Sequence, residues 1–125
     1  MTSLATELLS RSNGSSNWYR HVNPSHLFTD GIKLLIDDAN AGWLVDLVFS
    51  YQCDERISAN RFQLWSIRKL PEHLNHDAVV ECRTDTNAPV LCQQDIFVTD
   101  FPFDELGEKF EWYVCDQTMP LKSEY

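Results

Sequence analysis

The clearest hydrophobic pattern in the chain begins after Thr29. Apolar residues recur there at positions i, i+3, i+4 and i+7, the spacing of one face of an α-helix: Ile32, Leu35, Ile36 and Ala39. Thr29 and Asp30 suit the cap and first turn of this helix, because their side-chain oxygens accept hydrogen bonds from free backbone amides. The Asn-Ala-Gly sequence at 40–42 should end it.

A second helical stripe follows directly, formed by Trp43, Leu44, Leu47, Val48 and Tyr51. Val45 and Phe49 make the opposite side apolar as well, so this helix should be central and buried on most sides. Asp46 lies inside it. Because an ionised carboxylate in apolar surroundings is costly, Asp46 should have a hydrogen-bonding or ion-pair partner.

After Ser58 the pattern changes from helical to alternating, which predicts strands within residues 61–70, 77–84 and 90–99. The last two should form a hairpin centred on Asn87, with these opposite pairs: Ala78 and Ile96, Val80 and Gln94, Cys82 and Cys92, and Thr84 and Val90. This register gathers apolar side chains, including Val90, on one face of the hairpin. The polar side chains of Glu81, Arg83, Gln93 and Asp95 then belong to a wet face.

The C-terminal region predicts two further elements. One short helical turn should begin at Asp100, and residues 110–116 should form a final strand that Pro120 ends or confines to a sheet edge. Together the elements predict an α+β fold, with N-terminal helices packed on a small antiparallel β-sheet formed by the C-terminal half. We expect a single domain over residues 1–125, with a short helix and flexible linker in 1–16 and the α+β core in 17–125.

Composition narrows the possible partners. The chain has 125 residues and a net charge of -9, so its field repels nucleic acids and anionic membrane surfaces. The N-terminus lacks the marks of a secretory signal, and the longest apolar run is broken by Asp46 and too short to span a bilayer. We therefore expect a cytoplasmic protein whose four cysteines are reduced, with Cys82 and Cys92 as two packed thiols.

Six short motifs, in order, resemble those of a known family. They are NWYRH (17–21), FTDG (28–31), AGWLVD (41–46), FQLWSI (62–67), VTDFPFDE (98–105) and SEY (123–125). The sequence is similar to a family of small bacterial proteins of unknown function, often encoded on plasmids and other mobile elements. The resemblance implies no activity, cofactor or partner. The chain departs from the family pattern in PLKSEY at its end and in the loop PEHLNHD (71–77).

The NWYRH segment has two interpretations. In the first, Arg20 and His21 bind a small anion together with the amides that open the helix after Thr29, because guanidinium groups and helix N-termini both favour negative charge. In the second, Trp18 and Tyr19 fill the core, and Arg20 pairs with an acid such as Asp30 or Asp46. The second interpretation is favoured, because buried aromatic residues with one satisfied polar group are ordinary.

The sequence offers no convergent catalytic set. His21 and His26 lack an identifiable second group for acid-base catalysis, and no GxSxG motif is present. His73 and His76 have a spacing with metal character, but two histidines without further ligands make a poor site. We therefore predict no metal and no cofactor.

Two functional hypotheses remain. The leading one is a non-enzymatic, acidic interaction module that docks on another protein or on itself as a homodimer, since the chain is rich in Trp, Tyr and Phe. A narrower variant is a mimic of DNA. The alternative is a small enzyme or anionic-ligand-binding protein, with a pocket near Arg20, His21, Asp30 and Asp100.

Overall fold

The computed structural model describes residues 18–21 and 26–125. The predicted N-terminal helix and linker, residues 1–16, lie outside them. The elements in chain order are β1 (Trp18–Arg20), β2 (Leu27–Thr29), α2 (Asp30–Ala39), α3 (Gly42–Tyr51), α4 (Glu55–Ser58), β3 (Phe62–Lys69), β4 (Ala78–Arg83), β5 (Cys92–Ile96), α5 (Phe103–Leu106), β6 (Lys109–Cys115), β7 (Thr118–Met119) and the 3-10 turn η1 (Lys122–Glu124). None of the helices in the described ranges is long and apolar enough to cross a membrane.

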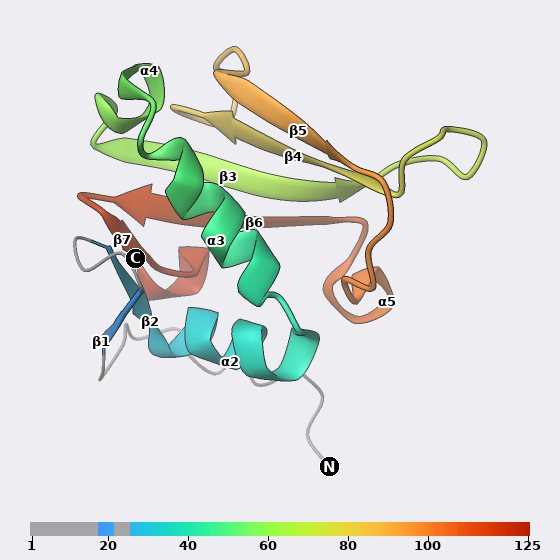
Figure 1. The fold of residues 1–125 in the computed structure, drawn as a ribbon, viewed down its shortest axis with the longest axis horizontal. Helices are drawn as coiled ribbons and strands as arrows, with labels where there is room; N and C mark the ends of the chain where they lie inside the picture. Colours follow the sequence, from blue (N-terminus) through green and yellow to red (C-terminus); the bar gives the residue numbers. More distant parts are fainter. Residues whose placement is uncertain (1–17, 22–25) are drawn as a thin grey trace.

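A seven-stranded sheet with the order β1-β2-β7-β6-β3-β4-β5 organises the fold (Figure 1). Its neighbouring strands are antiparallel except for the pair β2 and β7, which is parallel. Helix α3 lies along one face of the sheet, and α2 lies beside it at the β1-β2 end (Figure 1). The opposite face has no helix of the described residues over its centre.

The predicted arrangement of helices before strands is therefore only partly right. The fold mixes helices and strands, but β1 and β2 precede α2, and the helices lie in the middle of the chain. The sheet is also not wholly antiparallel. Strands of two or three residues are too short for alternation to show in the sequence, and their extended form depends on pairing with distant partners.

Helices α2 and α3 confirm the prediction made from the hydrophobic periodicity. Thr29 precedes α2 with extended backbone, and Asn40 ends the helix in the left-handed conformation with φ 51°. Helix α3 begins at Gly42 and buries Leu44 and Val48. The core cluster joins both helices to side chains of the sheet, among them Trp65, Ile67, Val80 and Trp112. The predicted burial of Trp65 and Trp112 is confirmed, but Trp18, expected in the core, is exposed.

The predicted hairpin register is confirmed at three of its four positions: Ala78 pairs with Ile96, Val80 with Gln94 and Cys82 with Cys92. The fourth predicted pair, Thr84 with Val90, lies beyond the ends of the two strands. One face assignment was wrong, because Val90 is exposed and lies before β5, which begins only at Cys92. Glu81 lies on the predicted polar face, but it is only 7% exposed. Strand β3 lies between β4 and β6, so neighbouring side chains shield the polar face of β4.

The C-terminal elements differ in their boundaries from the prediction. Strand β6 lies where the final strand was predicted, but it is not the last. Asp116 and Gln117, both with positive φ, end β6 and turn the chain into β7 before Pro120 is reached. The short helix predicted to begin at Asp100 is α5, which begins at Phe103 after Pro102. Proline has no backbone N–H and its φ is preset, so it suits the start of a helix.

Candidate functional site

The four residues predicted to line an anion pocket occupy two regions of the fold. Arg20 ends β1, His21 follows it, and Asp30 is the first residue of α2, which packs against β1. Asp100 is exposed in the connection between β5 and α5. Figure 1 places β1 and α5 on opposite sides of the molecule. Arg20, His21 and Asp30 therefore share a region that does not include Asp100.

The expected partner of Asp46 is His21. The Nε2 atom of His21 lies 2.7 Å from Oδ1 of Asp46, and its ring meets the ring of Phe49 edge-on with centroids 4.8 Å apart. Asp46 is exposed on the polar side of α3, while His21 is largely buried. This contact fixes the end of β1 on α3.

The N-terminus of α2 holds a carboxylate from the end of the chain. Thr29 Oγ1 donates to Glu124 Oε1 at 2.6 Å, and the Gly31 amide donates to Oε2 at 3.1 Å. The Leu121 amide donates to Oε1 at 3.0 Å. Negative charge is stabilised there by the helix dipole and by amides that have no partner within the helix. An exogenous anion at this position would have to displace or share the amide that Glu124 already occupies.

Gly31 allows this approach of the chain end to α2. A Cβ atom on Gly31 would lie 2.5 Å from Glu124 Oε1 and 2.7 Å from Leu121 Cγ, which is closer than atoms of a folded protein pack. The motifs FTDG and SEY thus contact each other, and this contact, called the lock below, holds the end of the chain on α2.

A polar pocket lies where α3, α4 and the ends of β2, β3 and β6 meet. It has a cavity volume of about 660 Å³, and its lining includes His26, Cys53, Gln63 and Arg61. His26 is only 6% exposed and its buried Nδ1 has no hydrogen-bond partner. Burial, together with the charge of His21, lowers the pKa of His26 below its ordinary value of 6.5. The imidazole is therefore neutral at pH 7.

Gln63 forms the most completely bonded polar group of this pocket. Its amide nitrogen lies 2.8 Å from Gln52 Oε1 and 3.0 Å from the carbonyl oxygens of Ile57 and Asn60, so its two hydrogens are shared among three acceptors. Its Oε1 accepts from the Trp65 indole at 2.8 Å. These contacts anchor α4 on β3 and satisfy the polar atoms of a buried glutamine, so Gln63 is structural.

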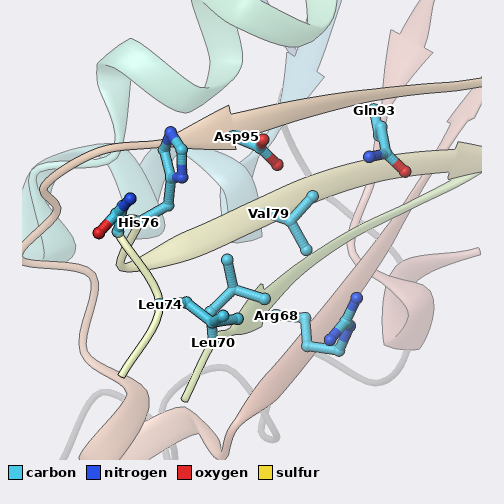
Figure 2. A pocket seen from close by; sticks show the side chains of 8 residues that line it. Arg68, Leu70, Leu74, His76, Val79, Gln93 and Asp95 are labelled. Atoms are coloured by element: carbon cyan, nitrogen blue, oxygen red, sulfur yellow. The ribbon is translucent and has the colours of Figure 1, made fainter. Parts of the chain in front are cut away.

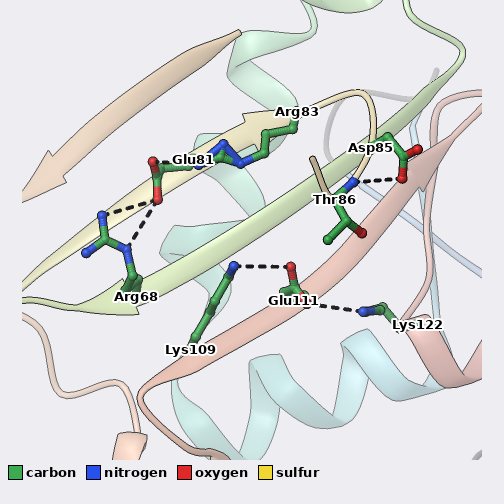
Figure 3. A network of polar contacts seen from close by, with 8 residues as sticks. All are labelled: Arg68, Glu81, Arg83, Asp85, Thr86, Lys109, Glu111 and Lys122. Atoms are coloured by element: carbon green, nitrogen blue, oxygen red, sulfur yellow. Dashed lines mark hydrogen bonds and ion pairs between the residues drawn. The ribbon is translucent and has the colours of Figure 1, made fainter. Parts of the chain in front are cut away.

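The sheet face turned away from α3 is called the open face. Its strand residues are Phe62, Leu64, Ser66, Arg68, Val79, Glu81, Arg83, Gln93, Asp95, Lys109, Glu111, Tyr113 and Cys115. Glu81 lies between two arginines, with Arg68 and Arg83 each at 3.4 Å. Glu111 lies between two lysines, with Lys122 at 3.1 Å and Lys109 at 3.6 Å (Figure 3). Each carboxylate is thus flanked by two cations.

A hollow of about 390 Å³ continues the open face at the β4-β5 end. Leu70, Leu74 and Val79 form its apolar part, while Arg68 and Asp95 lie on its sides (Figure 2). An apolar centre between opposite charges is the arrangement in which a protein side chain can anchor.

Aromatic rings occupy the other end of the open face. Phe62, Tyr113 and Tyr125 lie within 5.5 Å of one another by ring centroids, and Lys122 lies 6.0 Å above the Tyr113 ring. Tyr125 is exposed. The open face therefore combines rings, cations and a hollow on adjacent strands.

Sequence reasoning placed Glu81 and Arg83 on one face but did not identify this surface. Adding the β3 and β6 registers would have aligned Ser66 with both Glu81 and Glu111 and placed Arg68 beside Lys109. The C-terminal residues Lys122 and Tyr125 carried no such signal. Within residues 18–21 and 26–125, no group of three or more His, Cys, Asp or Glu side chains is arranged to hold a metal ion.

Comparison with known proteins identifies the family of the chain, whose function is unknown. A family model described as a family of unknown function (DUF6876) matches residues 3–125. No curated protein and no solved structure matches the chain.

Proposed function

Since the chain belongs to this family of unknown function, whose description supplies no activity, we propose a function from the geometry: a non-enzymatic module that binds a partner protein on its open face. The partner carries acidic side chains around one apolar anchor residue. As part of this proposal the protein is bacterial, encoded on a mobile element and cytoplasmic, and it binds no nucleic acid.

The observation that carries the proposal is the distribution of cations. The chain has a net charge of -9 and ten lysines and arginines, yet four of these ten lie together on the open face: Arg68, Arg83, Lys109 and Lys122. Arg68, Lys109 and Lys122 keep about half of their side chains in solvent. A local cationic surface in an acidic protein favours a partner with complementary carboxylates.

The hollow supplies the second element of recognition. Leu74 is an exposed apolar residue at its rim, and Val79 lies beneath it on β4. Interfaces concentrate their binding energy in one or two desolvated apolar anchors surrounded by polar contacts. A Leu, Met or Phe side chain of the partner would fill the hollow, and carboxylates beside it would reach Arg68.

A site-specific crosslinking experiment tests this proposal. A photoreactive amino acid at position 74 should capture the partner in the native host, whereas the same amino acid at exposed position 56, on α4, should not. Arg68→Glu should reduce capture at least about tenfold by reversing a complementary charge, and Lys33→Glu on α2 is the matched control. Equal capture from positions 74 and 56, or no effect of Arg68→Glu, would contradict the proposal.

The second candidate is a small-ligand site, and the His26 pocket is the observation that favours it. A buried imidazole with an unpartnered nitrogen beside a cavity of about 660 Å³ can accept or donate one hydrogen bond to a ligand. His21, one of the predicted ligand-binding residues, contacts the same Phe49 ring as His26. Titration with small anions and neutral amides, followed by NMR of the histidine rings, tests it. Unchanged His26 signals throughout would exclude these ligand classes.

A further inference from the structure

Strand β5 is the terminal strand of the sheet and pairs only with β4 among the described elements. It forms the outer edge beyond β4 in Figure 1. Four of the exposed large apolar residues flank it on both sides: Val90, Leu91, Phe97 and Val98. Phe97 and Val98 are the most exposed of these, at 69% and 72%. An edge with apolar flanks and no Lys or Pro in the strand lacks the usual protection against pairing with another chain.

The backbone of β5 offers hydrogen-bonding groups to such a chain. The Leu70 amide donates to the Asp77 carbonyl at 2.9 Å, so Asp77 faces β3. Because the direction of backbone groups alternates along an antiparallel strand, Val80 and Cys82 face β5 instead, and the Cys82 carbonyl accepts from the Leu91 amide at 2.7 Å. Their register partners Gln94 and Cys92 therefore bond to β4, and the N–H and C=O groups of Gln93 and Asp95 point away from the sheet.

The sequence around Gln94 is self-complementary for antiparallel pairing. A twofold axis at Gln94 sets the residues of one copy against those of the second copy as follows: Val90 with Val98, Leu91 with Phe97, Cys92 with Ile96, Gln93 with Asp95 and Gln94 with itself. All the apolar residues then meet apolar partners. Asp95, the one charged residue in this stretch, faces an amide that donates hydrogen bonds, so no like charges oppose each other.

We propose that two copies of this chain form a homodimer by antiparallel pairing of their β5 strands about Gln94. The register uses the outward-facing groups of Gln93 and Asp95, each of which meets the other residue of the second copy, and the contact is isologous, as a twofold dimer requires. The sheets of the two copies join into one, which makes their open faces continuous. This inference concerns the edge of the sheet, which borders the hollow at Gln93 and Asp95, and it does not depend on the proposed partner site.

Sedimentation analysis over a concentration series tests the dimer. The wild type should reach twice the 14.5 kDa mass of the chain. Gln93→Pro removes an outward-facing N–H without removing a bond to β4, so it should raise the dimer dissociation constant at least about tenfold. Phe97→Lys should do the same by replacing an exposed apolar contact, and its exposure means that folding should be unaffected.

Leu74→Lys is the matched control, because it makes the same kind of change at an exposed apolar residue away from the edge. It should weaken capture of the open-face partner but leave the dimer intact, so the two proposals fail separately. Circular dichroism establishes that each variant is folded.

Crosslinking tests the register. In a Cys92→Ser background, Gln94→Cys should form an oxidised homodimer, whereas Asp38→Cys, exposed on α2, should not. A wild type that stays at 14.5 kDa up to about millimolar concentration would overturn the proposal. So would a dimer that persists in both folded edge variants, or pairing of this edge only with a peptide of another protein.

Discussion

Replacing Gly31 with alanine tests whether the C-terminal residues Leu121 and Glu124 are held against the start of α2. Gly31 lies in the first turn of α2, and on an ordinary exposed helix Gly→Ala stabilises by about 0.5–1 kcal/mol. Here the added methyl group would enter the space of Leu121 Cγ and Glu124 Oε1, at 2.7 and 2.5 Å. The substitution should therefore destabilise, which reverses the ordinary sign.

The magnitude follows from the contacts that must move. Forcing a methyl group into a packed site costs about 1–3 kcal/mol. Displacing the Glu124 carboxylate weakens its 3.1 Å bond from the Gly31 amide, and a hydrogen bond to a charged group contributes about 1.5–3 kcal/mol. Subtracting the gain in helix propensity leaves a loss of about 1.5–5.5 kcal/mol, a large part of the stability of a typical domain.

Urea unfolding followed by tryptophan fluorescence measures this loss, provided that the slope with urea is unchanged. Gly42→Ala is the matched control, because it is also a first-turn glycine and its Cβ would meet only Ile36 Cγ2, at 3.8 Å. It should be neutral or slightly stabilising. If Gly31→Ala is as stable as Gly42→Ala, the chain end is not held on α2 and the lock is refuted.

Three further outcomes are expected. Glu124→Ala should lower the free energy of unfolding by about 1–3 kcal/mol. Acetate should restore part of this stability by accepting the hydrogen bonds that Glu124 accepted, whereas chloride at equal ionic strength should not. Equal stability in the two salts would contradict this. Because the folded-state pKa of His26 lies below 6.5, the unfolded chain binds more protons, so stability should be full above pH 6.5 and fall as the pH drops below it. His26→Asn should lose less stability than the wild type between pH 7.5 and 5.5. An unchanged pH profile of stability would refute the lowered pKa of His26. Glu81→Gln should destabilise by about 1–2 kcal/mol because it leaves Arg68 and Arg83 side by side without a counter-charge, as urea unfolding against the conservative Glu81→Asp would show.

The sequence predicted those parts of the fold in which a regular hydrophobic pattern extends over many consecutive residues. Helices α2 and α3 each carry ten residues with a consistent apolar stripe, and the hairpin register followed from alternation on both strands. The strands β1, β2 and β7 contain two or three residues, so their conformation depends on pairing between segments far apart in the chain. The parallel pairing of Leu27 with Thr118 has no counterpart in any local pattern.

The candidate sites show the same division. The sequence predicted a partner for Asp46 from apolar surroundings, but its side chain is exposed on α3. The sequence could not select the partner, His21, which lies 25 residues away and reaches α3 because β1 ends beside it. The open face required three strand registers at once, of which the sequence supplied one. The His26 pocket required the β6-β7 turn, whose two positive φ angles occur at Asp116 and Gln117 without a glycine.

The position of Glu124 changes how the family motifs are to be interpreted. FTDG supplies a hydroxyl, a free amide and a residue without a side chain at the start of α2, which is the composition of an anion site. SEY supplies the carboxylate that fills it, 93 residues away from the Gly31 amide. Two motifs that satisfy each other need no external ligand to explain their pairing. Functional recognition is then better sought on surfaces whose charges and apolar groups remain turned to solvent, which are the open face and the β5 edge.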